Sequence, residues 1–202
     1  MSILATIGGI CSAVIAVCTA VSAVCKVAES VVALGKAMGL IHTKDSQEQL
    51  GVRCLAAEEQ GITPEAFDHD YSAYLKAVNS VDISNVDPNQ WTKQEKALKA
   101  IEVVSGAIVH DYGKNAEQLI LALANHPESD FFTTERMNVL LNKAADNEID
   151  LPNVLAYIQG GDASAKEARQ DLLKVEQILN PDLSKDEALE VIDEKRENIA
   201  AN

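Results

Sequence analysis

One stretch of this chain constrains the fold more than any other. Residues 2–25 carry no charged side chain over 24 consecutive positions, and about 20 apolar residues in a helix are enough to cross the hydrocarbon core of a bilayer. Nothing basic precedes Lys26, as the start of a secretory signal would require, so we expect the segment to be retained. If it spans a membrane, Lys26 and Lys36 favour a cytoplasmic location for the rest of the chain.

The same segment repeats with a period of seven residues. The heptads CSAVIAV, CTAVSAV and CKVAESV follow one another over residues 11–31. Apolar positions spaced alternately three and four apart are typical of a coiled-coil seam, so the pattern predicts a long helix with a contact face. The two apolar columns are Ile7, Val14, Val21, Ala28 and Gly35, and Ile10, Val17, Val24, Val31 and Met38.

Small residues form a second pattern on the predicted helix. A residue of this kind recurs every fourth position from Gly8 to Ala20, and such a row lets another helix approach closely. A helix that is apolar nearly all round must be buried in lipid, in its own body or in copies of itself. The predicted helix-packing seam consists of Gly8, Ser12, Val14, Ala16, Val17, Ala20, Val21 and Val24.

Three of the four cysteines lie beside that seam at heptad spacing. Cys11, Cys18 and Cys25 are seven residues apart, which on a helix is about 10 Å along the axis and too far for a disulfide within the segment. We expect these thiols and Cys54 to be reduced and to serve as small apolar packing residues.

The remainder of the chain, residues 42–202, is strongly acidic. It holds 15 basic and 30 acidic residues. A surface with this charge repels phosphate backbones, so we expect no nucleic-acid partner. We expect this body to contact partner proteins instead. The sequence therefore predicts two parts, an apolar helix over residues 1–41 and an acidic, all-helical body over residues 42–202.

Helix caps and breaks within the body predict an all-α fold. Thr63 followed by Pro64 predicts a helix that runs to about Asn79. Thr92 and Glu95 form a capping box before a long helix that Gly106 and Gly113 bend or split. Further helices are expected over residues 133–147, 152–159, 164–179 and 184–200, and the short loops between them predict a compact array of antiparallel helices.

One local segment resembles a known family of enzymes. The sequence has no Walker loop, dinucleotide fingerprint, nucleophile elbow or paired CxxC motif. However, AIVHDYGK at residues 107–114 is similar to the His-Asp-x-Gly-Lys segment of the HD-domain phosphohydrolases. The resemblance implies one or two metal ions that activate water against a phosphate ester. The implied ligands are His110 and Asp111 from the segment, His69 as the earlier histidine, and Asp146 or Asp150 as the later aspartate.

Two functional hypotheses follow. The leading one is a non-enzymatic protein without a cofactor, whose N-terminal helix inserts into a membrane as an anchor, a pore or a component of a secretion system or virion, or assembles with copies of itself. Its acidic body lies in the cytoplasm and contacts partner proteins, and a soluble cytoplasmic assembly is the second location. The alternative is a metal-dependent phosphohydrolase that uses His110 and Asp111.

Overall fold

The structure is a computed structural model that describes residues 3–161 and 164–200. These residues form α-helices and short 3-10 helices and no strand, which confirms the predicted all-α class. The helices are α1 (Ile3–Val17), α2 (Val21–Ala37), α3 (Gln47–Glu59), α4 (Tyr71–Asn79), α5 (Lys93–Asn125), α6 (Thr134–Ala145), α7 (Leu151–Ile158), α8 (Ala165–Leu179) and α9 (Lys185–Ala200), with 3-10 turns η1 (Pro64–Phe67) and η2 (Pro88–Gln90).

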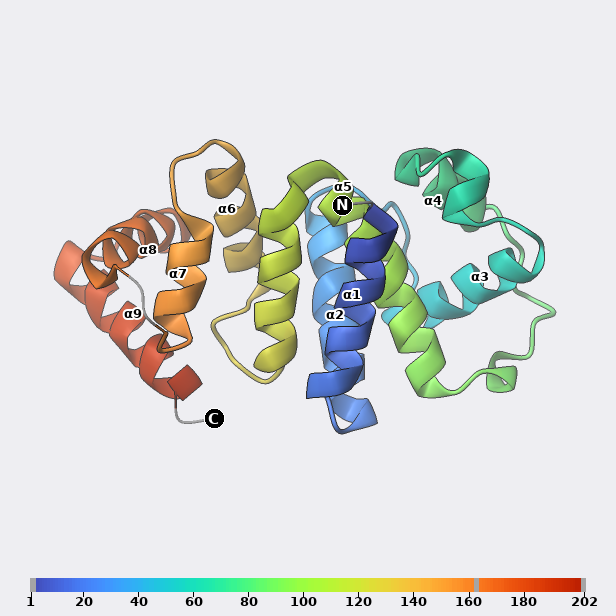
Figure 1. The fold of residues 1–202 in the computed structure, drawn as a ribbon, viewed down its shortest axis with the longest axis horizontal. Coiled ribbons are helices and arrows are strands. Elements are labelled where there is room, and N and C mark those ends of the chain that lie inside the picture. Colours follow the sequence, from blue (N-terminus) through green and yellow to red (C-terminus); the bar gives the residue numbers. More distant parts are fainter. Residues whose placement is uncertain (1–2, 162–163, 201–202) are drawn as a thin grey trace.

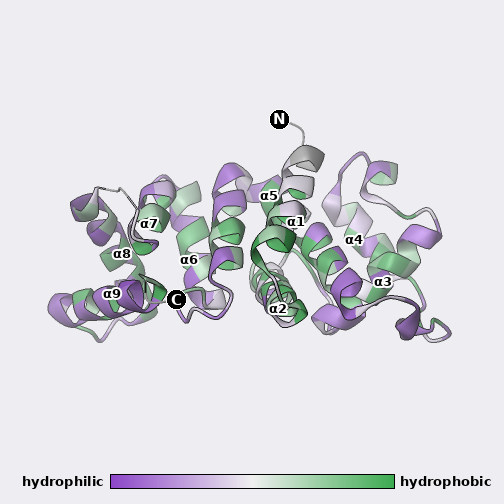
Figure 2. Cartoon of the chain, turned by 60° about the horizontal axis from the view of Figure 1, so that its bottom comes forward, coloured by the Kyte–Doolittle hydropathy of each residue, from purple (hydrophilic) through white to green (hydrophobic). Residues whose placement is uncertain are grey.

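The helices form an elongated array (Figure 1). Helices α3 and α4 lie at one end, α8 and α9 lie at the other, and α1, α2 and α5 occupy the middle. Helix α2 is largely hydrophobic along its length, whereas α9 is mostly hydrophilic (Figure 2). One continuous hydrophobic core runs through the array and includes residues from Ile7 in α1 to Ile199 in α9.

Helix α5 is the centre of this core. Every residue from Val103 to Val109 is buried, so this part of the helix has no solvent-facing side and needs cover all round. Its contacts with α2, α1 and α3 are the most extensive between any two elements of the described chain. The helix changes direction at Gly113, whose φ of 59° and ψ of −139° suit a residue without a Cβ.

Three glycines mark the places where other helices approach α5 most closely. A Cβ at Gly35 of α2 would lie 2.6 Å from Cγ1 of Val104. A Cβ at Gly51 of α3 would lie 2.2 Å from the carbonyl oxygen of Lys96. At Gly106 of α5 itself, an added Cβ would lie 2.4 Å from the ring of Tyr71 in α4. The spacing of these helices therefore depends on the missing side chains.

The predicted single N-terminal helix is instead two helices. The chain leaves helical geometry between Val17 and Val21, and Ala20 is extended with φ of −111° and ψ of 141°. Valine and threonine flank this break, and β-branched residues lose side-chain freedom in a helix. Because the segment is split, both α1 and α2 pack against α5. This packing stabilises the break by more than local helix propensity, which is a weak effect, favours one continuous helix.

The two apolar columns pack mainly inside the chain rather than along an uninterrupted coiled-coil seam. Ile7, Ile10 and Val14 of α1 are buried in the common core, as are Val24 and Val31 of α2. The columns reach solvent next to the break between the helices, where Val17 and Val21 are each 44% exposed. The prediction of a contact face was therefore useful, but α5 of the same chain covers most of it.

None of the described helices combines the length and the apolar character that crossing a bilayer requires. Helix α1 has 15 residues, which corresponds to a rise of about 22 Å against a hydrocarbon core of about 30 Å.

Most of the helices expected in the body are present, with two differences. The helix expected from Thr63 is interrupted, because Asp68 and His69 adopt positive φ angles of 51° and 62° between η1 and α4. Helix α3 was not predicted as a separate element, although Ser46 and Gln49 form a capping box at its start. The predicted capping box of Thr92 and Glu95 is confirmed at the start of α5.

A buried ion pair connects α6 to α8 at the far end of the array. Nη2 and Nε of Arg136 donate to Oε1 of Glu176 at 2.7 and 2.9 Å, and the two side chains are 6% and 1% exposed. The carbonyl oxygen of Phe131 and the amide of Asn180 complete the hydrogen bonding of the pair. Because the charges satisfy each other and have further partners, their burial is tolerated.

The close approach of α3 to α5 gives a direct test. We expect Gly51→Ala to lower the free energy of unfolding by about 1–3 kcal/mol, because the added methyl group meets the α5 backbone. Urea unfolding followed by circular dichroism measures the change. In the control Gly9→Ala nothing of the same chain lies within 4 Å of the new atom, so the free energy of unfolding of the single chain should be unchanged or higher by up to about 1 kcal/mol. Equal effects of the two substitutions would contradict this packing.

Candidate functional site

Helix α1 has one face in the core and an opposite face open to solvent. Ile7, Ile10 and Val14 face α5 and are buried, whereas Ile15 on the other side is 50% exposed. We define the α1 outer face as the exposed residues Gly8, Gly9, Ser12, Ile15, Ala16 and Val17, together with Ala20 and Val21 at the break. It contains six of the eight predicted seam residues, since only Val14 and Val24 of that set are buried.

The α1 outer face is uncharged and has few unmet polar groups. The hydroxyl of Ser12 donates to the carbonyl oxygen of Gly8 at 2.7 Å within the helix. A Cβ added at Gly8 or Gly9 would meet nothing within 4 Å. The small-residue row is therefore an open surface among the described residues, flanked by the exposed side chains of Ile15 and Val17.

The cysteines are packing residues in this structure. All four are free thiols, and Cys18 donates a hydrogen bond to the carbonyl oxygen of Ala124, which ties the end of α1 to the end of α5. Burial raises the pKa of Cys11 to about 11 and that of Cys54 to about 12. Thiols with such a pKa are protonated at neutral pH and are poor nucleophiles, which argues against a catalytic role.

The buried thiols and phenols predict a loss of stability at alkaline pH. Burial also raises the pKa of Tyr71 to about 12, from an ordinary value of 10.0, while the ordinary thiol value is 9.0. The unfolded chain therefore releases these protons first, so the free energy of unfolding falls as pH rises from 9 toward 12. Urea titrations at a series of pH values across this window measure the slope, and Cys54→Ala should make it shallower. An unchanged slope in that variant would contradict the assignment.

The structure places the residues implied by the phosphohydrolase resemblance on separate elements. His110 and Asp111 lie on α5 just before its change of direction, and Nδ1 of His110 lies 2.8 Å from Oδ1 of Asp111. His69 lies in the turn before α4, where its Nδ1 is buried and has no hydrogen-bond partner. Asp146 is the exposed C-cap residue of α6, and Asp150 caps the start of α7.

These side chains do not form a metal centre within the described part of the chain. No group of three or more His, Cys, Asp or Glu side chains there is arranged to hold a metal ion. The implied ligands do not come together in the described structure, namely His69, His110, Asp111 and Asp146. A local similarity of sequence around His110 does not fix the positions of residues that are distant in the chain. What remains of the motif is an exposed pair, His110 and Asp111, with about half of each side chain accessible.

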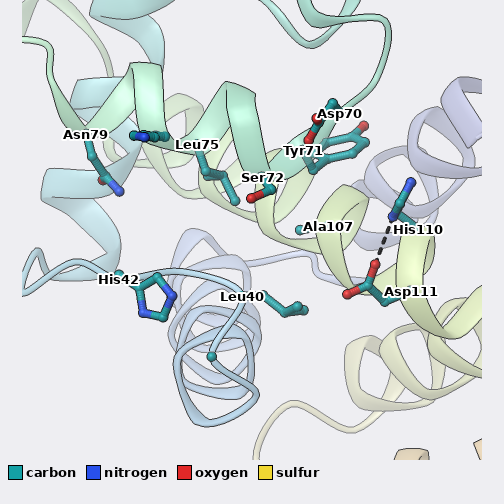
Figure 3. A pocket seen from close by; sticks show the side chains of 12 residues that line it. Leu40, His42, Asp70, Tyr71, Ser72, Leu75, Asn79, Ala107, His110 and Asp111 are labelled. Atoms are coloured by element: carbon teal, nitrogen blue, oxygen red, sulfur yellow. Dashed lines mark hydrogen bonds and ion pairs between the residues drawn. The ribbon is translucent and has the colours of Figure 1, made fainter.

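That pair lines a cleft that the sequence did not predict. The cleft has a volume of about 520 Å³ and lies between the segment that follows α2, one side of α4, and α5. Figure 3 shows His42 and Asn79 at one end, His110 and Asp111 at the other, and Leu40, Leu75 and Ala107 between them. These residues are up to 71 positions apart in the chain, from Leu40 to Asp111, so only the tertiary fold brings them together.

Comparison with protein-family models, with curated proteins and with solved structures finds no match to this chain. Two features of the molecule itself are candidate sites, the α1 outer face and the cleft between α4 and α5.

Proposed function

We propose that this protein is a self-assembling helical protein in which the α1 outer faces of two copies pack against each other. The observation that carries the proposal is the exposure of the small-residue row. Ile7, Ile10 and Val14 of α1 pack in the core, yet Gly8, Ser12 and Ala16 face solvent beside the half-exposed Ile15. Rows of small residues four apart let two helix backbones come close enough for extensive van der Waals contact.

The charge distribution supports contact at this face. The chain has a formal net charge of −14, so two copies repel each other in most orientations. The α1 outer face has no charged residue, and the nearest lysine in sequence, Lys26, is ion-paired with Glu128 of its own chain. A twofold axis through the face would make one uncharged surface complementary to itself. The acidic bodies would then point outward, where we place the contacts with partner proteins.

A second copy suits the α1 outer face better than a lipid surface does. Helices that lie in a membrane interface carry Lys and Arg on the polar side and Trp, Phe or Leu on the other. The described residues of α1 include none of these basic or aromatic residues. The acidic body would also be repelled by anionic lipid headgroups. We therefore favour a second copy of the chain over lipid as the partner of the α1 outer face.

The first test compares two isoleucines with nearly equal exposure. Ile15 on α1 is 50% exposed and Ile178 on α8 is 49% exposed. We expect the protein to be a dimer or larger assembly in sedimentation velocity, and Ile15→Glu to weaken association about a hundredfold, because a carboxylate is buried without a partner in the contact. Ile178→Glu, which adds the same charge elsewhere, should leave association unchanged. A monomeric wild-type chain, or equal effects of the two variants, would contradict the proposal.

A larger apolar residue in the small-residue row distinguishes a second copy from lipid as the partner of the α1 outer face. Ala16→Leu adds hydrophobic area but also holds two helices apart, so association between copies should weaken in the same sedimentation assay. Flotation with phosphatidylcholine vesicles should recover neither protein. Flotation of the wild type that increases in Ala16→Leu would assign the α1 outer face to lipid instead.

A further inference from the structure

The cleft between α4 and α5 has a polarity that specifies a class of ligand. We propose that it binds a short apolar peptide with a free amino terminus and a free carboxylate, held in an extended conformation along α4. Pockets of about 300–1,000 Å³ with an apolar lining and a few polar groups are typical small-molecule sites, and this one has a volume of about 520 Å³. The inference is independent of the proposed assembly through α1.

One end of the cleft is a set of unpartnered hydrogen-bond donors. Lys76 and Asn79 lie three residues apart on α4 and so project from the same side of that helix. His42 comes from the opposite wall (Figure 3). None of these three side chains has a hydrogen bond or ion pair within the described residues. A carboxylate accepts hydrogen bonds from an ammonium and an amide together, so this end suits the carboxyl terminus of the ligand.

The other end carries the negative charge. Asp111 accepts a hydrogen bond from His110 through Oδ1, which leaves lone pairs on both carboxylate oxygens for a further donor. Asp70 lies on the same side (Figure 3), although its own Oδ1 already accepts from the backbone amide of Ala73 as the N-cap of α4. An ammonium group suits this end, because the Asp111 carboxylate has free lone pairs there and the only lysine among the described residues that line the cleft, Lys76, belongs to the other end.

The middle of the cleft is apolar and fixed in shape. Leu75 and Ala107 are almost fully buried beneath it, and Leu40 faces them from the other wall. Tyr71 is locked against Gly106 of α5, where an added Cβ would lie 2.4 Å from its ring. The wall formed by α4 is thus packed closely against α5, and a site whose backbone is already in place binds at a lower ordering cost.

The length of the cleft sets the length of the ligand. From Ser72 to Asn79 the α4 axis rises about 10 Å, at 1.5 Å per residue. An extended peptide of three residues also covers about 10 Å. A tripeptide with apolar side chains therefore matches the α4 wall of the cleft in length.

The experiment uses the full chain and the tripeptide Ala-Leu-Ala as the probe. Titration followed by amide NMR shifts should show saturable binding, with the largest shifts in α4 and around Ala107. Acetylating the amine or amidating the carboxylate of the probe should each weaken binding about tenfold to a hundredfold, as expected for the loss of a hydrogen bond to a charged group. Failure to saturate at millimolar peptide would overturn the proposal.

Variants of the two ends assign the orientation. Lys76→Met should abolish the difference between Ala-Leu-Ala and its amide while keeping the penalty for acetylation, and Asp111→Asn should do the reverse. The controls Lys166→Met and Asp146→Asn make the same charge changes at exposed sites outside the cleft and should alter neither. If all four variants distinguish Ala-Leu-Ala from its acetylated form and from its amide to the same extent, the cleft is not the binding site.

Discussion

Helix α5 is buried on every side between Val103 and Val109, and the neighbouring helices are arranged around this segment. A helix with no solvent-facing side from Val103 to Val109 is unstable unless other helices surround it. Glycines at Gly35, Gly51 and Gly106 let α2, α3 and α4 come close enough to do so. The apolar N-terminal segment has a place in this arrangement, because two helices cover more of α5 than one long helix could.

The same arrangement explains both functional features. Once α1 has turned Ile7, Ile10 and Val14 toward α5, its small residues are left on the outside beside Ile15 and Val17, and the α1 outer face results. The packing of α4 across Gly106 leaves the cleft between α4, α5 and the segment after α2. The two sites lie on different elements, so the proposed assembly and the proposed ligand binding can be tested separately.

Local signals in the sequence predicted much of the fold. Caps such as Thr92 with Glu95 gave the start of α5, and breaks and caps placed the helices from α6 to α9 to within one or two residues. The division of the N-terminal helix was not predictable in this way, because neither proline nor glycine stands at residues 18–20 and the cause is packing against α5. The cleft was not predictable from the sequence either, because His42, Lys76 and Asp111 are far apart in the chain and belong to no common motif. The similarity at His110 and Asp111 fell on a pair that lines the cleft, but the described residues hold no cluster of metal ligands there.

The N-terminal segment and α5 pack as one core and should therefore unfold together. Native-state hydrogen exchange on the full chain, measured over a series of low urea concentrations, distinguishes this from independent opening, because amides in one cooperative unit exchange with the same free energy of opening. We expect the amides of residues 24–35 and 100–109 to share one opening free energy, close to that of global unfolding, and the same dependence on urea. Rapid exchange of residues 24–35 while residues 100–109 stay protected would contradict it.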